Sequence, residues 1–93
     1  PPFGRLVRLT FAHINPQYAP EQARRVANTL RQEKANRGIP NLDIVGPAPA
    51  FVPKVRGRHR WQILIRGDDP AQLLGDLSLP QGWTVDVEPV SLL

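Results

Sequence analysis

Eleven of the 93 residues are proline, and their positions constrain the fold more than any other feature of the chain. Proline fixes φ and lacks a backbone N–H, so it interrupts helices and central strands but suits turns and the first position of a helix. Asn15-Pro16 and Pro20 predict the end of one element and the start of a helix. Gly38 and Pro40 predict the end of that helix near residue 37. The sequence thus predicts several separate elements within a single small domain.

The apolar residues between these boundaries follow the periods of strands and helices. Residues 5–13 alternate, which places Val7, Leu9 and Phe11 on one face of a first strand. The residues at helical spacing in the next segment are Ala23, Val26, Ala27 and Leu30. Residues 42–45 predict a short second strand. Residues 46–53 contain three prolines, which cannot donate to a sheet ladder, and predict a stiff connector.

The second half of the chain predicts a strand, a short helix and a further strand. Residues 54–66 form the third strand, with a bulge expected at Gly57. Asp69 caps a helix that begins at Pro70, and its inward residues are Leu73, Leu74 and Leu77. Residues 83–88 follow a turn at residues 80–82 and form the fourth strand. The chain is therefore predicted to be an α+β domain of βαββαβ order, with a ferredoxin-like four-stranded antiparallel sheet and two helices on one face.

The expected core lies between that sheet and its helices. Its predicted members are Val7, Leu9, Phe11, Val26, Leu30, Leu42, Ile44, Trp61, Ile63, Ile65, Leu73, Leu77, Val85 and Val87. Trp83 is expected to point inward on the same strand as the last two. Alternation favours core packing over base stacking for Trp61. Tyr18 and Phe51 fall in connectors, where an aromatic ring either covers the edge of a core or stacks on a base at the surface.

The surplus positive charge is confined to residues 54–66. That segment holds five Lys and Arg residues and no acid, whereas the other 80 residues hold seven bases and eight acids. Period 2 places its polar residues on one face of a single strand: Lys54, Arg56, Arg58, Arg60, Gln62 and Arg66. A solvated sheet face is the simpler interpretation, but such faces usually carry both signs. An extended row of cations favours an extended polyanion, and nucleic acid is the commonest one.

Two neighbours of this basic face have a second interpretation. Arg8, on the first strand, is a further candidate for DNA contact. If the fourth strand lies next to the first, however, Asp86 and Glu88 would pair with Arg8 rather than serve acid–base chemistry.

The sequence gives little support for catalysis or for metal binding. It has no cysteine, its two histidines are distant in sequence, and its serines fall at turn or tail positions, so neither a metal site nor a nucleophilic triad is indicated. No phosphate-binding glycine motif occurs. An acylphosphatase-like activity would need a glycine-rich loop after the first strand, and residues 13–20 contain no glycine. No membrane-spanning run or signal-peptide pattern is present, and a chain that begins at Pro1 is expected to be part of a larger protein.

Four segments occur in an order that is typical of one family. They are Pro1-Pro2-Phe3, Val45-Gly-Pro-Ala-Pro49, Arg56-Gly-Arg-His-Arg-Trp-Gln62 and Val85-Asp-Val-Glu-Pro-Val-Ser-Leu-Leu93. Through them, essentially the whole chain resembles the C-terminal domain of primosomal protein N′, the bacterial replication-restart DNA helicase. The Gly-Arg-x-Arg-x-Gln pattern of that family matches Gly57, Arg58, Arg60 and Gln62.

The resemblance implies that residues 1–93 are an accessory DNA-binding domain of an ATP-dependent 3′-to-5′ helicase, with a fold similar to a small-subunit ribosomal protein. The implied partners are single-stranded and forked DNA, the helicase core of the same polypeptide and the acidic tail of single-stranded-DNA-binding protein. ATP, magnesium and zinc are implied for the parent protein only, so this domain is expected to be non-catalytic and without a cofactor. The implied location is the bacterial cytoplasm, in association with the nucleoid.

The chain departs from the family at two places. His59 stands where the family usually has Tyr, and Pro70 and Leu74 stand where polar contacts to the acidic tail are expected. These departures favour the DNA role over the tail-binding role. Three hypotheses remain open: a DNA-binding accessory domain, a protein-interaction module that docks on the helicase core or on the acidic tail, and an independent RNA-binding domain. The matching C-terminal segment argues against independence.

Overall fold

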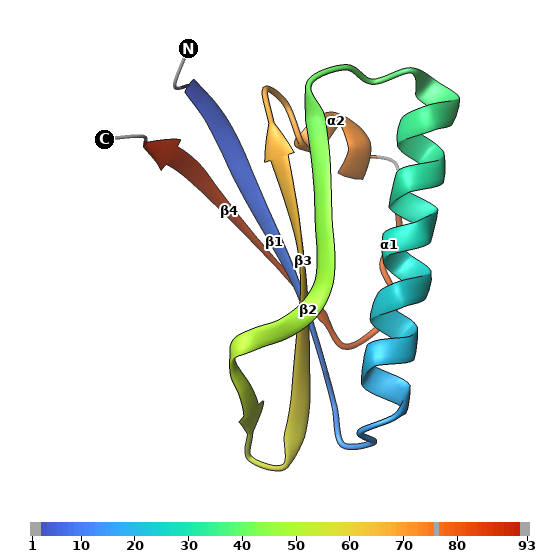
Figure 1. Ribbon diagram of the computed structural model, residues 1–93, viewed down its shortest axis with the longest axis vertical. Helices are drawn as coiled ribbons and strands as arrows, with labels where there is room; N and C mark the ends of the chain where they lie inside the picture. The colour runs from blue at the N-terminus through green and yellow to red at the C-terminus, as the bar shows by residue number, and fades with distance from the viewer. Residues whose placement is uncertain (1–2, 76, 92–93) are drawn as a thin grey trace.

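The computed structural model describes residues 3–75 and 77–91 (Figure 1). Its elements in chain order are β1 (Phe3–His13), α1 (Tyr18–Arg37), β2 (Leu42–Val55), β3 (Arg58–Gly67), α2 (Ala71–Leu74) and β4 (Trp83–Ser91). The strands form one antiparallel sheet in the order β2-β3-β1-β4. The predicted α+β class and the βαββαβ order are therefore confirmed. Pro1, Pro2, Leu92 and Leu93, which belong to the family-like segments, lie outside the described residues.

The helix α1 is the main element that covers the sheet. It begins two residues before the predicted Pro20, because the Asn15 side chain accepts hydrogen bonds from the backbone N–H groups of Gln17 (2.8 Å) and Tyr18 (3.0 Å). It ends at Arg37, and the following Gly38, with φ of 62°, closes the last turn as predicted. The second helix is shorter than expected and starts at Ala71, with no side-chain cap from Asp69. Among the described residues, neither α1 nor α2 combines the length and the hydropathy that a membrane span requires.

The core lies between α1 and the face of the sheet that carries the odd-numbered residues of β1. Val7, Leu9 and Phe11 are buried there against Ile63 and Ile65, which are fully buried. The other predicted residues that are buried are Val26, Leu30, Leu42 and Leu73. Ile44, Leu77 and Trp83 pack partly buried at its edge, and Trp61 is half-buried. Most of the predicted core is thus confirmed.

Two residues of β4 depart from that prediction. Val85 lies opposite Leu9 and Val87 opposite Val7, so both face the helix side as expected. They are nevertheless 48% and 58% exposed. The reason is that β4 is an edge strand, and α1 packs over β1, β2 and β3 instead. The alternation predicted the face correctly, but the inference that both valines belong to the core was wrong.

The predicted connector at residues 46–53 is also wrong, because β2 continues through it to Val55. The ladder with β3 is shifted twice, between Val45 and Ala48 and between Pro49 and Lys54. Because β2 is an edge strand, prolines fit at these irregular positions. The first shift contains Gly46, whose φ is 112° and where a Cβ would lie 2.9 Å from the carbonyl oxygen of Gln62. The Gly46–Pro47 peptide bond is cis.

Candidate nucleic-acid interface

The basic segment forms a hairpin rather than a single strand. Arg56 and Gly57 have φ values of 52° and 78° and make a two-residue turn between β2 and β3. In the register, Val55 lies opposite Arg58 and Lys54 opposite His59. Directly opposite residues share a face, so Lys54 and Arg58 point to opposite sides of the hairpin. The predictions that Lys54, Arg56 and Arg58 share one face of one strand, and that Gly57 is a bulge, were therefore wrong.

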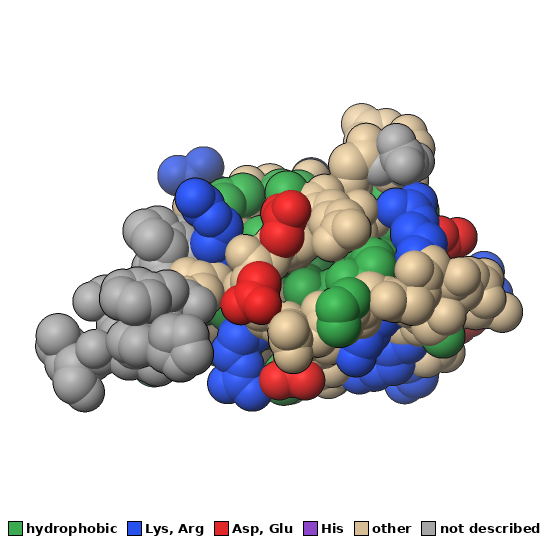
Figure 2. Space-filling model, turned by 90° about the horizontal axis from the view of Figure 1, so that it is seen from above, with side chains coloured by type: hydrophobic (Ala, Val, Ile, Leu, Met, Phe, Trp, Pro, Cys, Tyr) green, Lys and Arg blue, Asp and Glu red, His purple; other side chains and the backbone are tan. Residues whose placement is uncertain are grey.

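The tip of this hairpin extends past β1, whose last paired residue is His13, opposite His59 (Figure 1). Lys54, Arg56 and Arg58 are exposed there, and no described residue forms a hydrogen bond or ion pair with these side chains. We call these three residues the hairpin cations. The segment from residue 44 to residue 67 contains no acid. Figure 2 looks onto the opposite end of the molecule, where acidic and basic side chains are interspersed. Positive charge is thus gathered at the hairpin, in a segment that contains no acid.

The other candidate residues of β3 lie on the sheet face away from the helices, which we call the open face. Arg60 donates a hydrogen bond from Nη1 to the carbonyl oxygen of Val52 (3.0 Å). Arg66 pairs with Asp43 on β2 at 3.3 Å, and both side chains are more than half exposed. Such an exposed pair contributes little to stability. Arg60 therefore combines a structural contact with a place beside the hairpin cations, whereas Arg66 lies at the far end of β3 beside an acid.

Arg8 lies on the open face between two neighbours of different character. It is opposite Leu64 on β3 and opposite Asp86 on β4, so the condition that the fourth strand lies next to the first is met. The Glu88 side chain lies outside the described residues. Thr10, next along this face, is opposite Gln62. The sheet thus brings Arg8 close to Gln62 and Arg60, although the three are far apart in sequence.

A cleft of about 430 Å³ opens on this face. It is lined by Arg8, Ala50, Phe51, Val52, Arg60 and Gln62. Two of its sides come from the central strands β1 and β3, and the third from the irregular part of β2. It therefore joins two cations, an amide and an exposed aromatic ring in one hollow.

The two connector aromatics have different environments. The Tyr18 ring packs on the rings of His13, at 4.6 Å, and Phe11, at 6.0 Å, so it covers the edge of the core. Phe51 is 98% exposed. Trp61 lies opposite Phe11 on the helix side, in agreement with the predicted packing role. Tyr18 is 45% exposed, so Phe51 has the most exposed ring of the aromatics weighed for base stacking.

Arg31 was missed by the sequence reasoning. From α1 it donates hydrogen bonds to the carbonyl oxygens of Gly46 (2.6 Å) and Ile44 (3.3 Å). It thereby holds the first irregular part of β2 against the helix. No sequence pattern distinguishes Arg31 from the other exposed arginines of this helix.

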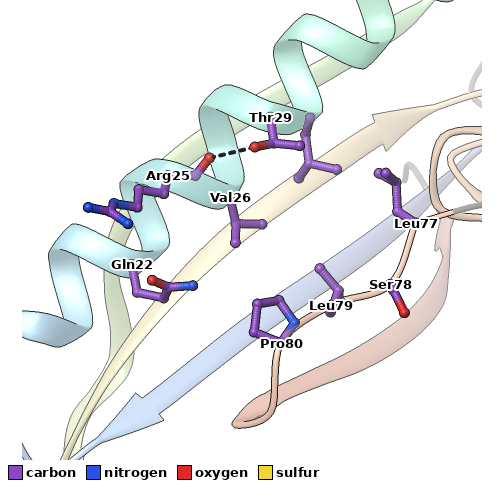
Figure 3. Close-up of a pocket in the computed structure, with 9 residues that line it drawn as sticks. Gln22, Arg25, Val26, Thr29, Leu77, Ser78, Leu79 and Pro80 are labelled. Atoms are coloured by element: carbon purple, nitrogen blue, oxygen red, sulfur yellow. Dashed lines mark hydrogen bonds between the residues drawn. The ribbon is translucent and has the colours of Figure 1, made fainter.

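A second, smaller cleft lies on the helix side. It encloses about 220 Å³ between α1 and the segment that leads from α2 to β4 (Figure 3). Val26 of α1 faces Leu77 and Leu79, while Arg25 stands at its border. Leu30 also lines the cleft. Its lining is mainly apolar and carries one cation. This cleft fits an apolar side chain better than a phosphate backbone.

The described residues offer no grouping suited to a metal ion: no three His, Cys, Asp or Glu side chains among them lie close together. His13 and His59 are opposite each other in the sheet, although they are distant in sequence. Nδ1 of His13 accepts a hydrogen bond from the backbone N–H of Asn15 (3.0 Å), and its ring stacks on Phe11. His13 therefore has a structural role.

Comparison with known families gives a match over nearly the whole chain. Residues 1–90 match the family described as the primosomal protein N C-terminal domain. The chain belongs to this family. A primosomal C-terminal domain is a non-catalytic accessory module in the restart of DNA replication. The family suggests DNA and replication proteins as the partners of such a domain. The match extends over both the hairpin and the open-face cleft of this primosomal domain.

Proposed function

We propose that this primosomal C-terminal domain binds single-stranded or branched DNA through its β2–β3 hairpin and the adjoining open face. The observation that carries the proposal is the set of hairpin cations, which are exposed, without partners among the described residues and without an acid in the surrounding segment. Unpaired cations can each replace a counterion on a phosphate, which favours binding entropically. Arg60, and at a greater distance Arg8, continue the positive surface onto the sheet.

The geometry favours phosphate contacts rather than reading of the base sequence. Same-face residues on a strand are about 6.6 Å apart, twice the rise per residue, so Arg58 and Arg60 follow an extended phosphate backbone. Lys54 points to the other side of the hairpin, so the hairpin presents cations on both of its surfaces. A protruding element charged on both sides suits a junction at which strands diverge. Binding is expected to depend little on sequence, because phosphates carry no sequence information.

The remaining family expectations form part of the same proposal. We infer that the domain assists an ATP-dependent helicase core in the same polypeptide, and that nucleotide, magnesium and zinc bind outside residues 1–93. Because bacterial replication takes place in the cytoplasm, the expected location is cytoplasmic, close to the nucleoid. The proposed contacts on DNA are Lys54, Arg56, Arg58, Arg60, Gln62 and Arg8. Arg66 is expected to contribute least, because Asp43 offsets its charge.

Fluorescence anisotropy tests the proposal. The purified domain is titrated into a labelled single strand, a fork and a duplex of the same length, each over a series of salt concentrations. Affinity for the strand and the fork should fall as salt rises, with similar values for unrelated sequences. Affinity that is independent of salt, or absent at low salt, would contradict the proposal.

A protein-interaction role is the second candidate, and the exposed Val85 and Val87 favour it. They present apolar surface on the helix side of β4, remote from the hairpin. Together with the cleft beside α1 they provide a surface for the helicase core or for the acidic tail. Calorimetric titration with an acidic peptide should give saturable binding that survives removal of the hairpin cations if this candidate is correct.

A further inference from the structure

We propose that the open-face cleft beside Phe51 holds one unpaired base of single-stranded DNA, with the base stacked on the Phe51 ring. The inference deepens the proposed function and rests on it, because it adds a base-binding site to a surface whose cations bind phosphates. It assigns a role to the exposed ring that packing does not explain.

The first support is the exposure of Phe51. A side chain of this size stabilises a fold when it is buried, yet 98% of its surface meets water. Its neighbour Ala50 is buried, so the strand itself is packed against the sheet at this point. The ring therefore projects from a fixed backbone. Exposed aromatic rings are the usual stacking platforms for unpaired bases.

The second support is the bracing of the strand that carries the ring. Arg60 donates to the carbonyl oxygen of Val52, one residue from Phe51, and Arg31 donates to that of Gly46. Pro49 and Pro53 flank the segment and restrict its backbone. Little backbone entropy then remains to be lost when a ligand binds. The backbone that carries the ring is thus held in place before DNA arrives.

The third support is the chemistry of the cleft. Its volume of about 430 Å³ lies within the range of about 300–1,000 Å³ that is typical of small-ligand sites. Arg60 and Arg8 provide cations for the flanking phosphates, and the Gln62 amide provides both a donor and an acceptor for the edge of a base. An acidic peptide would use the cations but would have no need of this amide. The combination of ring, amide and cations favours a nucleotide of an unpaired strand.

The test combines a change of the ring with removal of the bases. Phe51→Leu keeps an apolar side chain but removes the aromatic face, and Phe51→Trp keeps the face. Each is compared with the unaltered domain on an oligothymidine and on the same oligomer with abasic residues. The Phe51→Leu variant loses one stacked base and should bind oligothymidine about 5- to 140-fold more weakly than the unaltered domain. This range follows from a stacking energy of about 1–3 kcal/mol per base, with about 1.4 kcal/mol for each tenfold change in affinity.

The abasic oligomer should show no difference between the three proteins, because its phosphates remain. Phe51→Trp should bind oligothymidine at least as tightly as the unaltered domain. Val85→Ala, an exposed apolar residue on the other face, is the matched control and should leave both affinities unchanged. Because the Phe51 side chain lies in solvent, its replacement should leave the fold intact, which circular dichroism checks.

The possible failures are distinguishable. If the unaltered domain does not bind DNA at all, the proposed function and this inference both fail. If it binds, and loss of the hairpin cations weakens it while Phe51→Leu does not, the proposed function stands and the stacking site is overturned. Equal weakening on the intact and abasic oligomers would also overturn it, since the ring would then act only as an apolar contact. Tighter binding of oligouridine RNA than of DNA would refute the assignment to DNA.

Discussion

The hairpin cations make a quantitative prediction about salt. Each phosphate of a single strand that is neutralised contributes about −0.7 to the slope of log K against log salt. If Lys54, Arg56, Arg58 and Arg60 each neutralise one phosphate, the slope should be about −2.8. Between about 50 and about 200 mM salt the affinity of the unaltered domain should therefore fall about 50-fold.

The perturbation is the double substitution Arg56→Asn and Arg58→Gln. Arg56 has φ of 52°, a conformation that Asn adopts more readily than most residues, and Asn-Gly is a favoured two-residue hairpin turn. Arg58 is exposed, so Gln should fit there without loss of packing. The slope should then flatten by about 1.4, and the affinity should fall only about 7-fold over the same range of salt.

The assay is anisotropy of a labelled single strand, with Arg24→Gln and Arg25→Gln on α1 as the control of equal charge. Both control residues are exposed on the helix side, and Arg25 already pairs with Glu21 at 3.4 Å. The control should leave the slope unchanged. If both double variants flatten the slope equally, net charge rather than the hairpin governs binding, and the reasoning is refuted.

Three further predictions concern the fold and the chemistry. Val7→Ala should lower the free energy of unfolding by about 2 kcal/mol or more, because Val7 is buried. Val87, its partner across the sheet, is exposed, so Val87→Ala should lower that free energy by less than about 1 kcal/mol. Denaturant unfolding of both variants measures the difference, and equal losses would mean that β4 is covered. Gly46→Ala should destabilise the domain more than Gly57→Ala. Both glycines have a positive φ, but of the two only Gly46 has backbone in the way of a Cβ, which would lie 2.9 Å from the Gln62 carbonyl oxygen. Comparable melting temperatures of the two variants would contradict this. The purified domain should not hydrolyse ATP, and a chelator should not change its melting temperature. ATP hydrolysis faster than in a mock preparation would contradict the assignment of catalysis to the rest of the polypeptide.

The sequence predicted the central elements well because their signals are local and redundant. Val7, Leu9 and Phe11 alternate, and so do Trp61, Ile63 and Ile65, so the faces of β1 and β3 follow from period 2 alone. For the same reason Leu30 and its neighbours on α1 were found by helical spacing. Central strands and a long amphipathic helix leave little choice of register, because a slip of one residue would expose their apolar faces.

The edges of the sheet were less predictable, because there the surroundings rather than the residue pattern decide the outcome. Prolines argue against a central strand, but β2 lies at an edge where shifts of register accommodate Pro47 and Pro49. Arg-Gly is not among the usual pairs for a two-residue hairpin turn, so the sequence pattern predicts a continuous strand through Arg56 and Gly57. Alternation likewise predicts which face of the sheet Val87 lies on. It does not predict that no helix covers Val87 there. The bracing by Arg31 depends on tertiary contacts that no spacing encodes.

Mapping of amide chemical shifts during titration with a single strand tests the central claim most directly. An isotopically labelled domain should show its largest shifts in residues 54–60 and at Arg8 and Gln62, where the hairpin and the open-face cleft lie. The amides of Gln22, Thr29 and residues 77–79, which border the cleft on the helix side, should stay unchanged. The reverse pattern, with shifts confined to the helix side, would contradict the account and move the DNA contact away from the basic hairpin.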